Sequence, residues 1–183
     1  MRVISGSARG IKIDTLEGLD TRPTTDKVKG AIFSMIQTKV FNAKGLDLFS
    51  GSGALGIELL SRGADSVIMI EKNPLLKPII EANLSRAHLN EKAKLISSDV
   101  YSALNTLKGL KFDLIFMDPP YLKGDVKNCL DAIETLDLLA ENGLVVVEHD
   151  ISDTEILRGS EYYESLKTKK YGKIGITVFR RHA

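Results

Sequence analysis

The sequence contains a single cysteine, Cys129, and no tryptophan among its 183 residues. One cysteine excludes a disulfide framework and a metal site built from several thiolates. No apolar run approaches the roughly 20 residues of a membrane-spanning helix, and no apolar signal-peptide core follows Met1. With 43% apolar and 27% charged residues, the composition is that of one globular domain. We expect a soluble cytoplasmic protein whose core needs neither disulfides nor a metal ion.

The net charge is only +1, but it is unevenly distributed along the chain. Residues 1–44 carry 8 Lys and Arg against 4 Asp and Glu, and residues 165–183 carry 6 basic residues and no acidic ones. The remaining middle carries 11 basic against 20 acidic residues. Such a split indicates either a polyanion-binding surface or a solvated surface with chance clustering.

The middle of the chain alternates between strand-like and helix-like segments. Apolar runs bounded by turn residues lie at 45–50, 66–71, 93–97, 112–117 and 143–148. Helical periodicity between them predicts two buried stripes. One comprises Leu75, Ile79, Ala82 and Ala87, and the other comprises Val126, Leu130, Ile133 and the polar Asp137. Alternation of this kind predicts an α/β fold with a parallel sheet and helices on both faces.

The two ends of the chain follow a different pattern. Residues 3–4 and 11–13 predict two short strands joined by a loop with Arg9 near its tip. Thr25 is a candidate helix N-cap before a stripe of Val28, Ile32, Met35 and Ile36. Residues 162–166 and 174–179 predict a closing antiparallel pair, separated by the basic segment 167–173.

A glycine-rich loop follows the first strand of the predicted sheet. Gly51, Gly53 and Gly56 have the GxGxxG spacing, and Glu71 lies at the end of the next strand. The strand-loop-helix context predicts a nucleotide-type cofactor at this loop. The alternative is a tight turn whose glycines only allow close helix packing.

Asp47, four positions before Gly51, helps to choose the ligand. A carboxylate there repels the pyrophosphate of a dinucleotide, whereas it attracts the ammonium and sulfonium of S-adenosylmethionine. Glu71 would then accept hydrogen bonds from the ribose hydroxyls. Asp99, after the third strand, either accepts from the adenine amino group, or caps the next helix, or does both.

The most specific motif is Asp118-Pro119-Pro120-Tyr121, directly after the fourth strand. Asp118 and the Pro119 carbonyl can each accept one N–H of an exocyclic nucleobase amine, which leaves the nitrogen lone pair directed at an incoming methyl group. Positioning and electrostatics then provide most of the acceleration. Tyr121 would stack on an unpaired base. The alternative is a stiff surface loop. His88, His149 and His182 have no metal-ligand spacing, so no metal is expected.

With these motifs in place, the chain resembles class I S-adenosylmethionine-dependent methyltransferases, and in particular the RsmD family. The family resemblance rests on residues 4–10, 22–28, 46–56 and 171–173 together with the Asp-Pro-Pro-Tyr motif. It implies N2 methylation of guanine 966 in 16S ribosomal RNA. It also implies a Rossmann-like, seven-stranded, mostly parallel sheet with an antiparallel last strand and an N-terminal β-hairpin.

The resemblance and the motifs together define three sets of candidate site residues. The catalytic candidates are Asp118, Pro119, Pro120 and Tyr121. The cofactor-binding candidates are Asp47, Phe49, Ser50, Gly51, Ser52, Gly53, Glu71, Lys72, Asp99 and Val100. The RNA-binding candidates are Arg2, Arg9, Lys12, Arg22, Lys167, Lys169, Lys170 and Lys173, which would contact phosphates. Residues 1–40 would form an RNA-contacting extension of the methyltransferase domain at 41–183, within one compact unit.

Four other functions fit part of the pattern. The Asp-Pro-Pro-Tyr motif serves the N6 amine of adenine in DNA equally well, although the short chain leaves no room for a target-recognition domain. Protein glutamine methyltransferases typically have Asn where this chain has Asp118. A nonenzymatic RNA-binding assembly factor keeps the fold without the chemistry, and an oxidoreductase shares only the glycine spacing. We therefore expect 16S rRNA or the small ribosomal subunit as partner, and no membrane or obligate protein partner.

Overall fold

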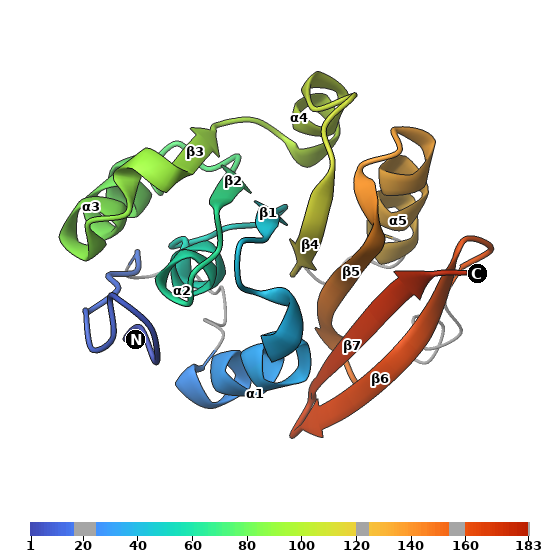
Figure 1. The fold of residues 1–183 in the computed structure, drawn as a ribbon, viewed down its shortest axis with the longest axis horizontal. Coiled ribbons are helices and arrows are strands. Elements are labelled where there is room, and N and C mark those ends of the chain that lie inside the picture. Colours follow the sequence, from blue (N-terminus) through green and yellow to red (C-terminus); the bar gives the residue numbers. More distant parts are fainter. Residues whose placement is uncertain (17–24, 120–124, 154–159, 183) are drawn as a thin grey trace.

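The computed structural model describes residues 1–16, 25–119, 125–153 and 160–182. Its centre is a seven-stranded sheet (Figure 1). The strands are β1 (Lys44–Asp47), β2 (Ser66–Ile70), β3 (Ala93–Ile96), β4 (Phe112–Met117), β5 (Leu139–Asp150), β6 (Tyr163–Tyr171) and β7 (Ile174–Arg181). The helices are α1 (Asp26–Ile36), α2 (Ala54–Ser61), α3 (Lys77–Ala87), α4 (Val100–Thr106) and α5 (Asp125–Thr135), with short 3-10 turns at Gln37–Lys39 and Asn90–Lys92.

The strand order is β3-β2-β1-β4-β5-β7-β6. Strands β1 to β5 are parallel to one another, and β7 is antiparallel to both of its neighbours, β5 and β6. This confirms the predicted mostly parallel sheet with an antiparallel last strand. The order reverses between β1 and β4, where open α/β sheets bind ligands beyond the carboxyl ends of the strands.

Two apolar cores lie on the two faces of the sheet because successive strand residues point to opposite sides. Leu114 and Phe116 of β4 pack in the core that contains residues of α1, α2 and α3. Ile115 and Met117 pack in the core that contains residues of α4 and α5. The predicted helices on both faces are thus confirmed (Figure 1).

The N-terminal segment differs from the two strands predicted for it. Its two arms, within residues 1–16, form one isolated antiparallel bridge, between Arg2 and Lys12, rather than two strands, although backbone hydrogen bonds such as Val3 N to Ile11 O at 2.9 Å also join them. The intervening backbone bonds to α2 instead, because the Glu58 carboxylate accepts from Ile4 N and Ser5 N at 2.8 and 3.1 Å. At Gly6 (φ +87°) a Cβ atom would overlap the backbone of α2. The segment is therefore a hairpin-shaped loop fastened to α2.

The basic segment at 167–173, predicted to separate the last two strands, lies mostly within β6. Strand β6 continues to Tyr171, and only Gly172 and Lys173 form the turn into β7. Gly172 has φ +62°, a conformation that favours glycine. The lysines could not be recognised as strand residues because alternate positions on this edge strand face solvent rather than the core.

Two helix predictions had different outcomes. Thr25 caps α1 as predicted, with its Oγ1 accepting from Val28 N at 3.3 Å. The stripe predicted from Leu75 is wrong at Leu75, which precedes α3 and is 63% exposed, and at the exposed Ala82, but Ala87 is buried as predicted. The buried positions of α3 are Ile80, Asn83, Leu84 and Ala87. Among the described helices, none is long and apolar enough to span a bilayer.

Candidate functional site

The candidate site lies at the carboxyl ends of β1, β2, β3 and β4, around the point where the strand order reverses (Figure 1). The glycine loop connects β1 to α2, and Asp118 follows β4 directly. Asp47 pairs in register with Phe116, so the two chain segments leave the sheet side by side. Asp47 and Asp118, which are 71 positions apart in the sequence, are thereby brought to the same edge of the sheet.

The glycine loop has the backbone that its sequence predicts. Gly51 and Gly53 have φ values of +54° and +81°, in the left-handed region that favours glycine. Gly53 N donates to Ser50 O at 2.7 Å, and Ser50 N donates to Ile70 O at 3.0 Å. Glu71 Oε2 accepts from Gly51 N at 2.9 Å. The loop is thus held against β2 by main-chain and carboxylate contacts.

Asp47 is the most unusual carboxylate of this edge. It is only 2% exposed, and its Oδ2 has no hydrogen-bond partner among the described residues. Burial raises the pKa of Asp47 to about 7, despite the opposing effect of Ser50 and nearby backbone N–H groups. A buried polar atom without a partner is costly. Asp47 Oδ2 therefore suits a ligand that brings a donor or a positive charge.

Asp118 lies next to a second buried acid. Burial, together with the charges of Glu148 and Asp47, raises the pKa of Asp118 well above the usual carboxyl range. The next residue, Pro119, is buried. Pro120 and Tyr121, the other two members of the predicted catalytic motif, lie outside the described residues.

Glu148 was missed by the sequence analysis, although it ends the predicted strand at 143–148. Met117 pairs in register with Val147, so Asp118, directly after β4, lies level with Glu148 within β5. Glu148 is only 3% exposed. The available signal was an acidic residue at the carboxyl end of a buried strand. Three carboxylates, on Asp47, Asp118 and Glu148, therefore gather at neighbouring strands.

The remaining cofactor candidates lie on the adjoining turns. Asp99 caps α4, because its Oδ1 accepts from Ser102 N at 3.0 Å, and this contact lowers its pKa. The capping interpretation of Asp99 is thus confirmed, and its exposed carboxylate retains capacity for a ligand. Phe49 is half-buried, Lys72 is exposed, and Val100 packs in the core beneath α4. Val100 therefore offers a ligand mainly its backbone.

The basic candidates lie in two separate regions. Arg9 is exposed, whereas Arg2 Nη1 donates to Gly10 O at 2.8 Å and Lys12 Nζ lies 3.4 Å from Asp14 Oδ1. Lys167, Lys169 and Lys170 lie on β6 and Lys173 lies in the turn after it. Arg22 lies outside the described residues. Figure 1 shows the two regions on opposite sides of the sheet's centre.

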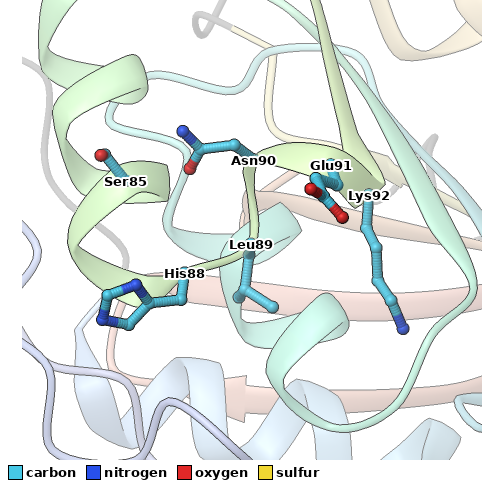
Figure 2. Close-up of a pocket in the computed structure, with 6 residues that line it drawn as sticks. All are labelled: Ser85, His88, Leu89, Asn90, Glu91 and Lys92. Atoms are coloured by element: carbon cyan, nitrogen blue, oxygen red, sulfur yellow. The ribbon is translucent and has the colours of Figure 1, made fainter.

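A surface hollow between α3 and β3 is a separate feature (Figure 2). The residues that line it are Ser85, His88, Leu89, Asn90, Glu91 and Lys92. It lies where the chain enters β3, at the amino ends of the parallel strands, so it is on the opposite edge from the glycine loop. Among the described residues, no group of three or more His, Cys, Asp or Glu side chains is placed to hold a metal ion.

Comparisons with known proteins place this site in a family. The family model described as "Conserved hypothetical protein 95" matches residues 1–180. A Bacillus subtilis protein, YlbH, provisionally named an rRNA methyltransferase, is 37% identical over 185 residues, covering 99% of each chain. Ribosomal RNA small subunit methyltransferase D of Escherichia coli is 32% identical over 84% of this chain and 76% of its own.

The solved structures agree with the sequence relatives. An Escherichia coli structure, yhhF, provisionally named a methyltransferase, has a TM-score of 0.89 and 30% identity, and the match covers 100% of this chain and 98% of that one. The glycine loop and Asp118, which contributed to the predicted family, lie at one edge of this sheet. The chain therefore belongs to the RsmD family and has the Rossmann-like fold of class I methyltransferases.

Proposed function

We propose that the protein is an S-adenosylmethionine-dependent rRNA methyltransferase that methylates the exocyclic N2 of a guanine in 16S ribosomal RNA. The family membership and the names of its relatives support an rRNA methyltransferase. The donor, the guanine and the N2 position rest on the chemistry of the site.

The observation that carries the choice of donor is that Oδ2 of buried Asp47 has no hydrogen-bond partner in the described part of the chain. Asp118 and Glu148 add two more carboxylates nearby, and burial together with the charges of Glu148 and Asp47 raises the pKa of Asp118. A cationic ligand relieves this repulsion, whereas an anionic pyrophosphate increases it. S-adenosylmethionine carries both an ammonium and a sulfonium, so its charge complements this edge. The same charge argues against the oxidoreductase alternative.

When bound, S-adenosylmethionine supplies an electrophilic methyl group. The residues of this chain contribute binding and orientation: Asp47 faces the cationic end, and Glu71 retains lone pairs for ribose hydroxyls beyond the two backbone N–H groups it already binds. Asp118 accepts an N–H of the target amine and thereby orients the nitrogen lone pair. The cation formed by transfer is acidic and loses its proton without a strong base, so positioning is the main requirement.

Glu148 supports guanine rather than adenine as the target. The Watson–Crick edge of guanine presents N1–H and N2–H donors side by side, whereas adenine presents an acceptor at N1 next to its amine. Two neighbouring acceptors, on Asp118 and Glu148, match the guanine pattern. We propose that Asp118 binds the reacting N2 amine and that Glu148 accepts from N1–H.

The test is methyl transfer to unmethylated small ribosomal subunits, followed by RNA digestion and nucleoside mass spectrometry. We expect N2-methylguanosine with the unaltered protein and its loss with Asp118→Ala. Asp131→Asn, on the outer side of α5 and paired with Lys127, is the matched control and should retain activity. N6-methyladenine in DNA or methylated glutamine in protein, with no product in rRNA, would overturn the substrate assignment. S-adenosylmethionine binding without any methylated product would favour the assembly-factor alternative.

A further inference from the structure

Asn83 joins the glycine loop to the N-terminal segment through a single buried amide. It lies on α3 and is 0% exposed. Its Nδ2 donates to Ser52 O at 3.0 Å and to Asp14 O at 2.9 Å. Its Oδ1 accepts from Asp14 N at 2.9 Å and from Arg86 Nη1 at 3.2 Å. Both N–H donors and both acceptor sites of the amide are thus used.

The contact with Ser52 acts at the least constrained point of the loop. Ser52 lies between Gly51 and Gly53, two glycines with positive φ and wide conformational freedom. Because the Ser52 carbonyl and the Gly53 N–H belong to one planar peptide unit, holding the carbonyl also directs the N–H. That N–H donates to Ser50 O at 2.7 Å. Asn83 therefore holds the peptide plane in the middle of the loop.

Anchoring of the N-terminal segment does not by itself account for the contacts that Asn83 makes. Arg86 already anchors the same residues, because its Nη1 donates to Lys12 O at 2.8 Å and its Nη2 lies 2.7 Å from Asp14 Oδ2. Within the described part of the chain, the hydrogen bonds of Arg86 go to the N-terminal segment and to Asn83, whereas Asn83 bonds to the glycine loop directly. The bond to Ser52 is thus what distinguishes Asn83 from its neighbour one helical turn away.

We propose that Asn83 is a positioning residue for the cofactor, which acts by holding the Ser52–Gly53 peptide in the orientation that the ligand requires. The part that concerns cofactor affinity rests on the proposed function. The part that concerns the loop itself does not, because it can be observed without any ligand. A buried carbonyl that loses its donor is unfavourable, so the loop shifts when the amide is removed.

The test compares Asn83→Asp with Arg86→Met. Asn83→Asp keeps the size and the acceptor for Asp14 N but loses both donors, whereas Arg86→Met removes the neighbouring anchor and leaves Ser52 O bonded. Amide hydrogen exchange of the ligand-free proteins reports on Gly53 N–H, and calorimetry with S-adenosylhomocysteine reports on affinity. Both are measured well below the melting temperature of each variant. Asn83→Ala replaces Asn83→Asp if the new charge prevents folding.

We expect faster exchange at Gly53 and about tenfold weaker S-adenosylhomocysteine binding in the Asn83 variant only. Arg86→Met should lower the melting temperature while leaving exchange at Gly53 and the affinity unchanged. Equal exchange and equal affinity in both variants and the unaltered protein would overturn the proposal. If the unaltered protein does not bind S-adenosylhomocysteine, the proposed function fails, and exchange at Gly53 still decides the role of Asn83.

Discussion

Glu71 Oε2 accepts a hydrogen bond from Gly51 N at 2.9 Å, so the acidic residue after β2 fixes the first glycine of the loop after β1. Its other oxygen accepts from Asn73 N at 2.8 Å. The sequence pattern assigned Glu71 only to the ribose of the cofactor. The structure shows that the same side chain also shapes the glycine loop.

Replacing Glu71 should weaken cofactor binding even when the new side chain is neutral and does not repel the ligand. Glu71→Ala leaves Gly51 N without its acceptor, and Glu71→Gln directs an NH2 group at one of two N–H donors. We expect S-adenosylhomocysteine affinity to fall at least about tenfold for Ala and less for Gln, measured by calorimetry. Glu81→Gln, on the exposed side of α3, is the control. Unchanged affinity in Glu71→Ala would show that the loop does not depend on this contact.

Asp47 should make cofactor affinity depend on pH. Its pKa in the ligand-free protein is raised to about 7, and a cationic ligand favours the ionised form. Affinity for S-adenosylmethionine should therefore rise as the pH increases through the Asp47 pKa of about 7. Below that pH, Asp47 should release its proton when the ligand binds. Calorimetry in buffers of different ionisation enthalpy measures the released protons. Asp47→Asn should bind more weakly and lose this pH dependence.

The same pKa shift has a consequence for stability. Because the folded pKa of Asp47 lies above its usual 3.8, the folded state holds a proton that the unfolded state has lost between those values. This contribution lowers the free energy of unfolding as pH rises from about 4 to about 7. Asp47→Asn should thus raise the melting temperature of the ligand-free protein at pH 8 by a few degrees, and not at pH 4. Equal melting temperatures at pH 8 would contradict the raised pKa.

Replacing Asp118 should lower the rate of methyl transfer while leaving cofactor affinity nearly unchanged. Asp118→Asn removes one negative charge and one acceptor beside the target amine but leaves the glycine loop intact. We expect the rate of methyl transfer to fall roughly 10²–10³-fold, as for the loss of one oriented polar group in other sites. S-adenosylhomocysteine affinity should change little, as measured on the same preparation. A variant that keeps full activity would remove Asp118 from the reaction.

The N-terminal basic residues should contribute to RNA affinity through charge. Replacing Arg9 and Lys12 with Glu should weaken RNA binding and flatten its dependence on salt, because fewer counterions are released. Lys108→Glu combined with Lys111→Glu, at two exposed positions just before β4, reverses the same number of charges and serves as the control. Filter binding at several salt concentrations gives both quantities. Binding and salt slope equal to those of the control would exclude this segment from the RNA contact.

Lys29 and Glu58 form a buried pair that fastens the N-terminal segment. Both side chains are 0% exposed, with 3.4 Å between Nζ and Oε2, and Lys29 Nζ also donates to Arg2 O at 2.5 Å. Lys29→Met removes one of two cations beside the buried Glu58 carboxylate, because Arg62 Nε still lies 2.8 Å from its Oε1. We therefore expect a loss of stability below the about 3–5 kcal/mol of a fully unpaired buried charge. Thermal unfolding should show a clear fall in melting temperature, whereas Lys27→Met, at an exposed position of α1, should not. A similar melting temperature for the two variants would argue against a stabilising role.

The strands of the sheet were largely predictable because each is a short apolar run. β2, β3 and β4 lie within one residue of their predicted bounds, because most of their positions are apolar and turn residues bound each run. The glycine loop was also predictable, because only glycine readily adopts the backbone of Gly51 and Gly53. β6 was not, because an exposed edge strand rich in lysine has the composition of a loop.

Sequence alone determined the strand-and-helix order, the glycine loop after β1 and the acid after β4, because each depends on neighbours within a few residues. The tertiary structure decided which polar groups share an environment. It placed Glu148 beside Asp118, left Asp47 Oδ2 without a partner, and joined Ser52 to Asp14 through Asn83. These relationships arise only when distant segments pack together, since burial and proximity, not residue type, set the pKa of a carboxyl and the role of an amide.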